Sequence, residues 1–148
     1  MGHAQISWYP SDPANPFACI DVLIGNSEAL LDQQPHLGFE FPEPVRIKAV
    51  IDTGAGPVLI SRTYARHCKL FQTRPDSEIR VIGGSVKCGE HAGRISFPNT
   101  TLCPYDRIRI VSGDFHKEHH FACLIGTDIL RHWRTTFDAK TNLVTIDD

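Results

Sequence analysis

One short motif carries the residues best suited to chemistry: Asp52, Thr53, Gly54 and Ala55, directly after the apolar segment 45–51. A carboxylate at the end of a buried strand is partly desolvated. The glycine allows close approach of the backbone, and the small Ala55 leaves room for a substrate. Thr53 adds a hydroxyl that can hold the loop by hydrogen bonding. The motif indicates acid–base chemistry by an aspartate, although Asp-x-Gly turns also follow strands in proteins without such activity.

One carboxylate cannot carry out this chemistry alone. Two must lie close enough to share one proton, because neighbouring like charges resist joint ionisation. The ionised member then takes a proton from water, and the protonated member gives one to the carbonyl under attack. The chain has no second Asp-Thr-Gly or Asp-Ser-Gly: Asp114 follows a glycine, and Asp128 ends a Gly-Thr-Asp triplet. We therefore expect the second carboxylate from another copy of the chain, related by two-fold symmetry.

Other groups of reactive residues give weaker hypotheses. The stretch 116–120 (HKEHH) holds three histidines, but no cysteine pair flanks it at zinc-site spacing, so we interpret it as a solvated turn. The sequence has no signature of a Cys–His protease. The pair Gly83-Gly84 lacks the lysine and the serine or threonine of a phosphate-binding loop. We therefore expect no metal ion and no cofactor.

The segments that must position Asp52 read as short strands. Segment 45–51 runs straight into the motif, and the apolar run Val58-Leu59-Ile60 follows it. Further strands are expected from alternation and apolar runs over residues 17–25, 77–82, 85–97, 108–111, 121–125, 135–138 and 143–146. The paired glycines at 83–84 suit a tight hairpin turn.

Only two short helices are expected. One covers residues 62–69 after a capping Ser61, and the other covers residues 127–133 after Gly126. The segment 26–44 contains several prolines and is expected to be a long connection. Short strands with two short helices indicate a mainly-β domain.

Length and composition favour one domain with a buried core. The chain has 148 residues, a formal net charge of -2 and 41% hydrophobic residues, and domains commonly run about 100–150 residues. We expect a polar N-terminal extension over residues 1–16 and one domain over residues 17–148. The small net charge gives no reason to expect nucleic acid or an anionic membrane as a partner.

Targeting signals are not evident in the sequence. No apolar run approaches the roughly 20 residues of a membrane-spanning helix. The N-terminus lacks the basic start and apolar stretch of a signal peptide. The five cysteines are odd in number and widely spaced, which argues against a disulfide framework. We therefore expect a cytoplasmic protein with reduced thiols.

Three elements in a fixed order resemble the retropepsin-like (retroviral-type) aspartic protease family. They are Ile51-Asp52-Thr53-Gly54-Ala55, the hairpin Ile82-Gly83-Gly84-Ser85, and Leu124-Ile125-Gly126-Thr127-Asp128-Ile129-Leu130. The matching elements span residues 17–146, nearly the whole chain. The segment from Gly126 onward is most similar to the protease domain of the DNA-damage-inducible ubiquitin-shuttle proteins, and bacterial single-lobe homologues are also similar. The resemblance implies a mainly-β fold, closed and barrel-like with orthogonally packed strands, with one or two short helices and assembly into a homodimer.

The resemblance also implies an activity and residue roles. The chain would be an aspartic endopeptidase that cuts a peptide or protein substrate with water activated by two Asp52 carboxylates. Thr53 would hydrogen-bond its mate across the dimer axis, and Gly54 would bind the substrate backbone through its carbonyl. Ala55 and Gly56 would lie beside the bound peptide.

The same resemblance assigns supporting positions further along the chain. Ile82, Gly83 and Gly84 would lie near the tip of a flap that closes over the peptide. Ile125 and Gly126 would support the catalytic loop from beneath.

The chain departs from the viral pattern in two places that bear on its subunit contacts. Gly56 and Pro57 stand where viral members carry acidic residues whose backbone amides hold the substrate, and Pro57 has no N–H to donate. Thr127 replaces the arginine that usually follows the glycine. Gly56-Pro57 and the long connection over residues 26–44 favour an alternative, a retropepsin-like dimer that binds a peptide or scaffolds a partner without cutting.

Overall fold

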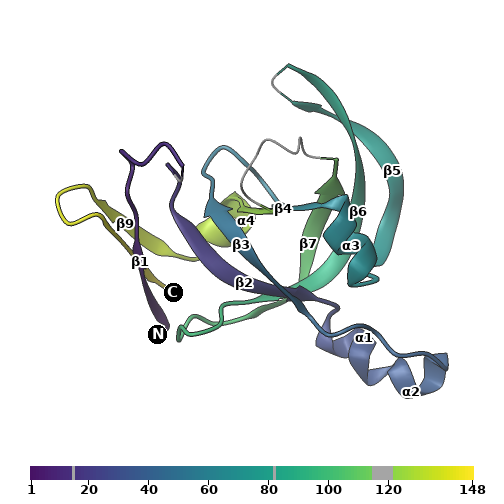
Figure 1. The fold of residues 1–148 in the computed structure, drawn as a ribbon. Coiled ribbons are helices and arrows are strands. Elements are labelled where there is room, and N and C mark those ends of the chain that lie inside the picture. The colour runs from purple at the N-terminus through teal and green to yellow at the C-terminus, as the bar shows by residue number, and fades with distance from the viewer. Residues whose placement is uncertain (15, 82, 115–121) are drawn as a thin grey trace.

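The computed structural model describes residues 1–14, 16–81, 83–114 and 122–148. Within these residues the chain forms ten strands and four short helices (Figure 1). The strands are β1 (His3–Ser7), β2 (Cys19–Gly25), β3 (Val45–Ile51), β4 (Val58–Ser61), β5 (Phe71–Val81), β6 (Gly84–Ser96), β7 (Tyr105–Gly113), β8 (Cys123–Ile125), β9 (Arg134–Asp138) and β10 (Leu143–Asp147). The helices are α1 (Glu28–Asp32), α2 (Gln34–Leu37), α3 (Arg62–His67) and α4 (Thr127–Leu130).

Seven strands form a sheet that closes on itself. Their order is β2-β3-β8-β4-β7-β6-β5, and β2 also pairs with β6. That additional pairing, Leu23–Gly25 against residues 94–96, joins the two sides of the sheet into a ring and leaves β5 outside it. The mainly-β, barrel-like fold expected from the resemblance is thus confirmed.

The interior of the ring is filled by β-branched side chains. Strand β2 alternates between half-buried and buried positions, with Val22 and Ile24 fully buried. Val58 and Ile60 of β4 are buried in the same way, as is Ile125 of β8. Each such side chain contributes about 1.5–3 kcal/mol of hydrophobic stabilisation, so the core fixes the position of every strand that carries a site residue.

A second sheet, in the order β1-β10-β9, is built from the two ends of the chain. The expected hairpin of β9 and β10 forms, and β1 pairs antiparallel with β10 from His3 opposite Asp147 to Ser7 opposite Leu143. The expected boundary at residue 17 left β1 outside the domain, because its sequence, HAQIS, has only two inward apolar residues. Gly2 is packed so closely that an added Cβ would lie 2.4 Å from the Thr101 carbonyl oxygen.

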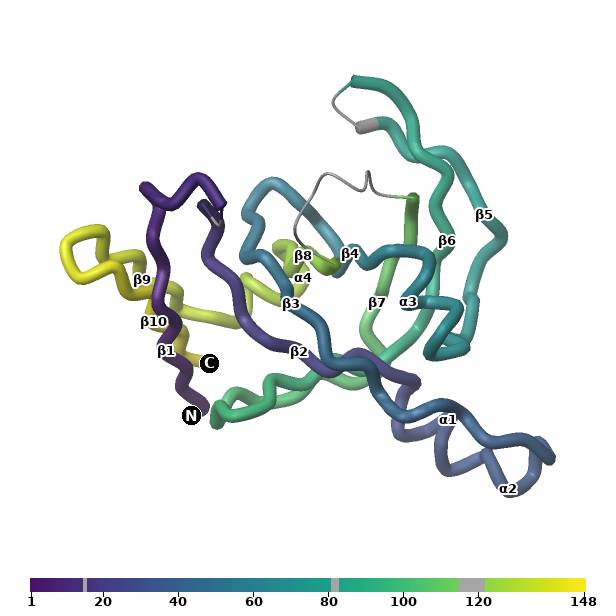
Figure 2. Tube along the Cα trace, viewed as in Figure 1, coloured from purple at the N-terminus to yellow at the C-terminus, as the bar shows by residue number. Residues whose placement is uncertain are grey.

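The connection over residues 26–44 differs from the expectation, because it contains the two helical turns α1 and α2. Ser27 caps α1 by accepting a hydrogen bond from the Leu30 N–H. Pro35 lies in the first turn of α2, a position that needs no N–H donor. Figures 1 and 2 show the pair extending away from the barrel. No helix among the described residues is long and apolar enough to cross a membrane.

Candidate active site

The loop of residues 52–57, called the Asp52 loop below, joins β3 to β4 across the end of β8. Strand β8 lies between the other two, parallel to β3 and antiparallel to β4. Ile51 is paired with Ile125, and the Asp52 N–H donates to the Ile125 carbonyl at 3.0 Å. The carboxylate therefore stands at the end of a strand in the middle of the sheet, as the sequence predicted.

Backbone hydrogen bonds inside the loop orient the carboxylate. The Gly54 N–H donates to Asp52 Oδ1 at 2.8 Å, and the Ala55 N–H lies 3.3 Å from the Asp52 carbonyl oxygen. A Cβ at position 54 would lie 3.2 Å from the same carboxylate oxygen. Asp52 is half-buried, whereas Thr53 and Gly54 are exposed. One side of the loop is thus fixed by the sheet and the other faces outward.

The start of α4 holds the loop from below. Its first two N–H groups, from Thr127 and Asp128, donate to the carbonyls of Ala55 and Gly56, each at 2.9 Å. The first turn of a helix has N–H groups without intrahelical partners, and here the loop supplies the acceptors.

Gly126 lies directly beneath the loop, and only glycine fits there. A Cβ at this position would lie 2.4, 2.5 and 2.7 Å from the carbonyl oxygens of Gly56, Pro57 and Ala55. Ile125 is fully buried beside it. The structure therefore brings together Asp52, the loop residues and both of the positions predicted to support it.

The predicted flap is the hairpin of β5 and β6. Gly83 and Gly84 lie at its tip with φ of +94° and +153°, a conformation that L side chains rarely adopt. Ile82, predicted at the same tip, lies outside the described residues, as do the histidines and Glu118 of segment 116–120. No hydrogen bond within the described part of the chain joins Gly83 or Gly84 to the Asp52 loop.

Figures 1 and 2 show this hairpin rising beyond the rest of the fold. Strand β6 pairs with β7 only from Cys88 onward, whereas β5 and β6 stay paired as far as Val81 and Gly84. Residues 77–81 and 83–87 are therefore a two-stranded extension of the sheet, and they are called the flap below.

The structure describes the five cysteines and Trp133, whereas segment 116–120 lies outside the described residues and its interpretation stays a prediction. No disulfide joins any of the five cysteines. Cys123 is buried, and burial raises the pKa of its thiol, so it stays protonated rather than becoming a nucleophile. Among residues 1–14, 16–81, 83–114 and 122–148, no three His, Cys, Asp or Glu side chains are grouped so as to hold a metal ion. Trp133 is buried against Phe97, with ring centroids 5.0 Å apart.

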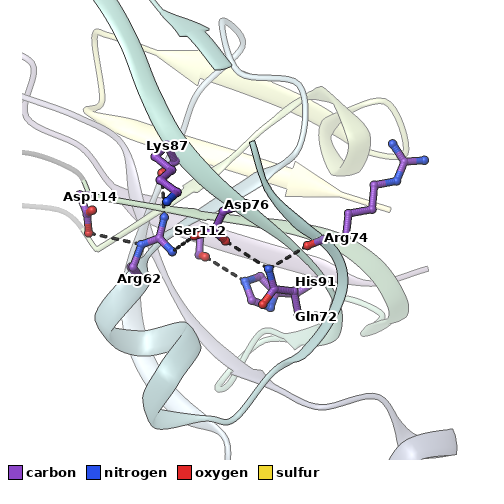
Figure 3. Close-up of polar contacts among 8 residues, drawn as sticks. All are labelled: Arg62, Gln72, Arg74, Asp76, Lys87, His91, Ser112 and Asp114. Atoms are coloured by element: carbon purple, nitrogen blue, oxygen red, sulfur yellow. Dashed lines mark hydrogen bonds and ion pairs between the residues drawn. The ribbon is translucent and has the colours of Figure 1, made fainter. Parts of the chain in front are cut away.

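A polar cluster at the base of the flap was not predicted. Arg62 donates to Asp76 at 2.8 Å, and His91 Nε2 lies 2.8 Å from Ser112 Oγ (Figure 3). These residues lie far apart in the sequence, between positions 62 and 112. The charged residues of these segments are of the kind found on any solvated surface. No spacing signal marks them, because only the strand pairing brings them together.

Comparisons with known proteins identify the fold. No protein-family model matches the chain, and no curated protein does. A retropepsin-like aspartic protease from Rickettsia conorii matches with a TM-score of 0.56 and 14% identity, over 99% of this chain and 91% of that one. EIAV protease in complex with the inhibitor HBY-793 matches with a TM-score of 0.51 and 17% identity, over 82% of this chain and 92% of that one.

The retroviral protease-like domain of Ddi1 from Leishmania major has a TM-score of 0.48 and 19% identity, over 87% of this chain and 88% of that one. The first two matches cover most of each chain. The chain therefore has the fold of the retropepsin-like aspartic proteases.

Proposed function

We propose that the chain is an aspartic endopeptidase that acts as a homodimer, with one Asp52 carboxylate from each subunit. The observation that carries the proposal is the Asp52 loop. Its carboxylate is aimed by the Gly54 N–H and held at the sheet by Ile125, in a chain with the retropepsin-like fold. Such rigid backbone support is what an acid–base group needs to meet a substrate in one geometry.

In the proposed dimer, the two Asp52 carboxylates face each other across the symmetry axis and share one proton. The ionised carboxylate removes a proton from water as the water oxygen attacks the peptide carbonyl carbon. The protonated carboxylate gives its proton to the carbonyl oxygen. When the C–N bond of the tetrahedral intermediate breaks, the carboxyl that took the proton of water gives it to the leaving amine. The other carboxylate takes a proton from a hydroxyl of the intermediate, so the pair returns to its starting state with one shared proton.

Two observations support assembly as a dimer. The chain has one Asp-Thr-Gly motif, and the chemistry needs two carboxylates. Thr53 and Gly54 are exposed at the open side of the loop in the single chain, where a second copy would supply the contacts. We propose that the dimer axis passes beside these two residues.

The substrate proposed for this site is an extended peptide. The flap supplies a two-stranded arm with glycines at its tip, and an extended peptide can bind along such an edge by backbone hydrogen bonds. Pro57 cannot donate one of them. The carbonyls of Ala55 and Gly56 accept hydrogen bonds from α4. Because Pro57 lacks the backbone amide used in the viral pattern, another group would supply that contact with the peptide.

The test is cleavage of a mixed peptide library by the protein and by Asp52→Asn. We expect the substitution to lower cleavage by roughly 10³-fold or more, because the amide cannot accept the proton of water. Sedimentation should show that the variant still forms a dimer. A pepstatin-type inhibitor should block the unaltered protein.

Asp32→Asn is the matched control, since Asp32 is an exposed residue at the end of α1. It should cleave like the unaltered protein. Full activity in Asp52→Asn would overturn the proposed mechanism. If the protein binds peptides but shows no Asp52-dependent cleavage, the alternative is favoured, a dimer that binds peptides and does not cut them. Pro57 is the observation that motivates this alternative.

A further inference from the structure

Arg62 occupies an unusual place in the polar cluster at the base of the flap. It is the first residue of α3, directly after Ser61 of β4. Its side chain is only 14% exposed, although an arginine at a helix start is normally solvated. A guanidinium that is largely buried must have its donors satisfied by the groups around it.

The guanidinium contacts three other strands or strand ends (Figure 3). Nη1 donates to Asp76 Oδ2 of β5 at 2.8 Å, and Nη2 donates to the Lys87 carbonyl oxygen of β6 at 2.8 Å. Nε lies 3.5 Å from Oδ1 of Asp114, just after β7. The planar fork of arginine allows these bonds to form together, which a lysine cannot reproduce.

The backbone of β5 is shaped to present Asp76. Its register against β6 shifts twice, between Gln72 and Arg74 and again between Arg74 and Ser77, and each shift places an extra residue on β5. Such bulges redirect side chains. Gln72 Nε2 then donates to Asp76 Oδ1 at 3.1 Å.

The opposite strand leaves space for this carboxylate. A Cβ at Gly89 would lie 3.0 Å from Asp76 Oδ1. Beneath it, His91 and Ser112 are buried and bind each other, with Nε2 2.8 Å from Oγ. Burial lowers the pKa of His91, so the neutral ring does not compete with Arg62 for Asp76.

The two residues that Arg62 binds lie where the flap extends beyond the rest of the sheet. Asp76 immediately precedes the flap on β5, and Lys87 is its last residue on β6, one residue before the pairing of Cys88 with Gly113 begins. Beyond that point each strand has only the other as a neighbour. A two-stranded hairpin is marginally stable by itself, so its direction depends on how its base is held.

We propose that Arg62 is a positioning residue for the flap: its contacts with Asp76 and Lys87 set the angle at which the hairpin stands over the Asp52 loop. The inference rests on the proposed function, in which the flap closes on a peptide. Arg62 follows β4, and β4 follows the Asp52 loop, so one rigid segment connects the loop to the base of the flap.

The proposal predicts an effect on binding rather than on chemistry. When only a fraction of molecules has the flap in its competent position, the apparent affinity falls by that fraction. Loss of the Arg62 contacts should therefore raise KM for a peptide, and Kd for an active-site inhibitor, by about tenfold. The value of kcat should change little, because Asp52 and its supports are untouched.

The experiment compares Arg62→Met with Arg74→Met. Arg74 lies on β5 beside the cluster, but its side chain is 75% exposed and points away from it (Figure 3). We expect Arg62→Met to raise KM and to speed hydrogen exchange of the described flap amides, with core strand β2 unchanged. Arg74→Met should alter neither, and Arg62→Lys, which keeps the charge, should fall between them.

Two outcomes overturn the proposal: equal KM values for Arg62→Met and Arg74→Met, or flap exchange that does not respond to Arg62→Met. If the unaltered protein cleaves no peptide, the proposed function fails, and the exchange comparison alone decides the role of Arg62. If Arg62→Met also loses protection in β2, the decisive variant is Asp76→Asn, which removes only the charge at the edge strand. Unchanged flap exchange in that variant contradicts the proposal.

Discussion

The Asp52 loop and the flap are held to the rest of the fold by different kinds of contact. The loop is fixed by backbone groups: the N–H groups of Thr127 and Asp128 bind its carbonyls, and Gly126 fits beneath it without a side chain. The base of the flap is fixed by charged side chains, chiefly Arg62 and Asp76. Backbone contacts with no room for a side chain allow little motion, whereas an ion pair between two side chains at an edge strand can open and close.

This difference fits the roles proposed for the two regions. A carboxylate that shares a proton must stay in one geometry, since small displacements weaken catalysis. A flap must move so that a peptide can enter and leave. We therefore expect the Asp52 loop to be rigid and the flap to be adjustable, and the predictions below test whether the two regions differ in this way.

The largest effect is expected at Gly126. Gly126→Ala places a Cβ 2.4–2.7 Å from three backbone carbonyl oxygens, so the loop or α4 must shift. We expect a loss of about 3 kcal/mol in the free energy of unfolding, measured in urea, together with loss of cleavage.

Gly56→Ala is the control for that prediction, because nothing lies within 4 Å of a Cβ there. It should change stability by less than about 0.5 kcal/mol. Equal effects of the two substitutions would show that the close packing under the loop is not what fixes it.

An intermediate effect is expected from acid. The Arg62 guanidinium lowers the pKa of Asp76, so the ion pair is fully present above the ordinary carboxyl pKa of about 3.9. It is lost as the pH falls through the lowered value. Flap amides should therefore lose protection from exchange below about pH 4, toward the level of Asp76→Asn at neutral pH.

The amides of Thr127 and Asp128 provide the internal reference, since they bind backbone carbonyls, which do not titrate in this range. Their protection, corrected for the intrinsic exchange rate, should persist where that of the flap is lost. Parallel loss in both regions would mean that acid unfolds the whole domain and does not release the flap first. In Asp76→Asn, the protection of the flap amides should be the same at neutral pH as below about pH 4.

The smallest effect is expected at the cap of α3. Ser61 Oγ accepts a hydrogen bond from the Thr63 N–H at 3.4 Å. Ser61→Ala should cost about 0.5–1 kcal/mol in thermal unfolding and should raise KM only slightly, because Arg62 keeps its partners. Thr63→Ala, which leaves the N–H in place, is the control. A KM increase as large as that of Arg62→Met would show that the helix start, and not the guanidinium, sets the flap.

The same contrast explains how far the site could be predicted from sequence. The Asp52 loop depends on residue types that local sequence displays: an apolar strand, Asp-Thr-Gly, and the distant Ile125-Gly126 pair. The backbone around position 126 admits only glycine, and a requirement of this kind appears in the sequence as a short motif. The mainly-β class followed from the apolar runs in the same way.

Other features depend on tertiary contacts that no local pattern reports. Arg62 and Asp76 meet because the register of β5 against β6 shifts twice between Gln72 and Ser77, and neither residue is unusual in its own segment. Strand β1 has too few apolar residues to be recognised, since it is stabilised by pairing with β10. The turns α1 and α2 lie in a proline-containing segment, where capping by Ser27 decides the outcome.

The pairing of β1 with β10 has a mechanical consequence. The two strands are antiparallel, and His3 lies opposite Asp147, with the Asp148 N–H bound to the Gly2 carbonyl. Ladder bonds between such strands run perpendicular to the chain. Tension applied to residues 1 and 148 would break these bonds one after another from the end where the two termini lie, rather than loading them all at once in shear. Pulling the ends apart should therefore detach β1 at low force while the barrel that carries Asp52 stays folded.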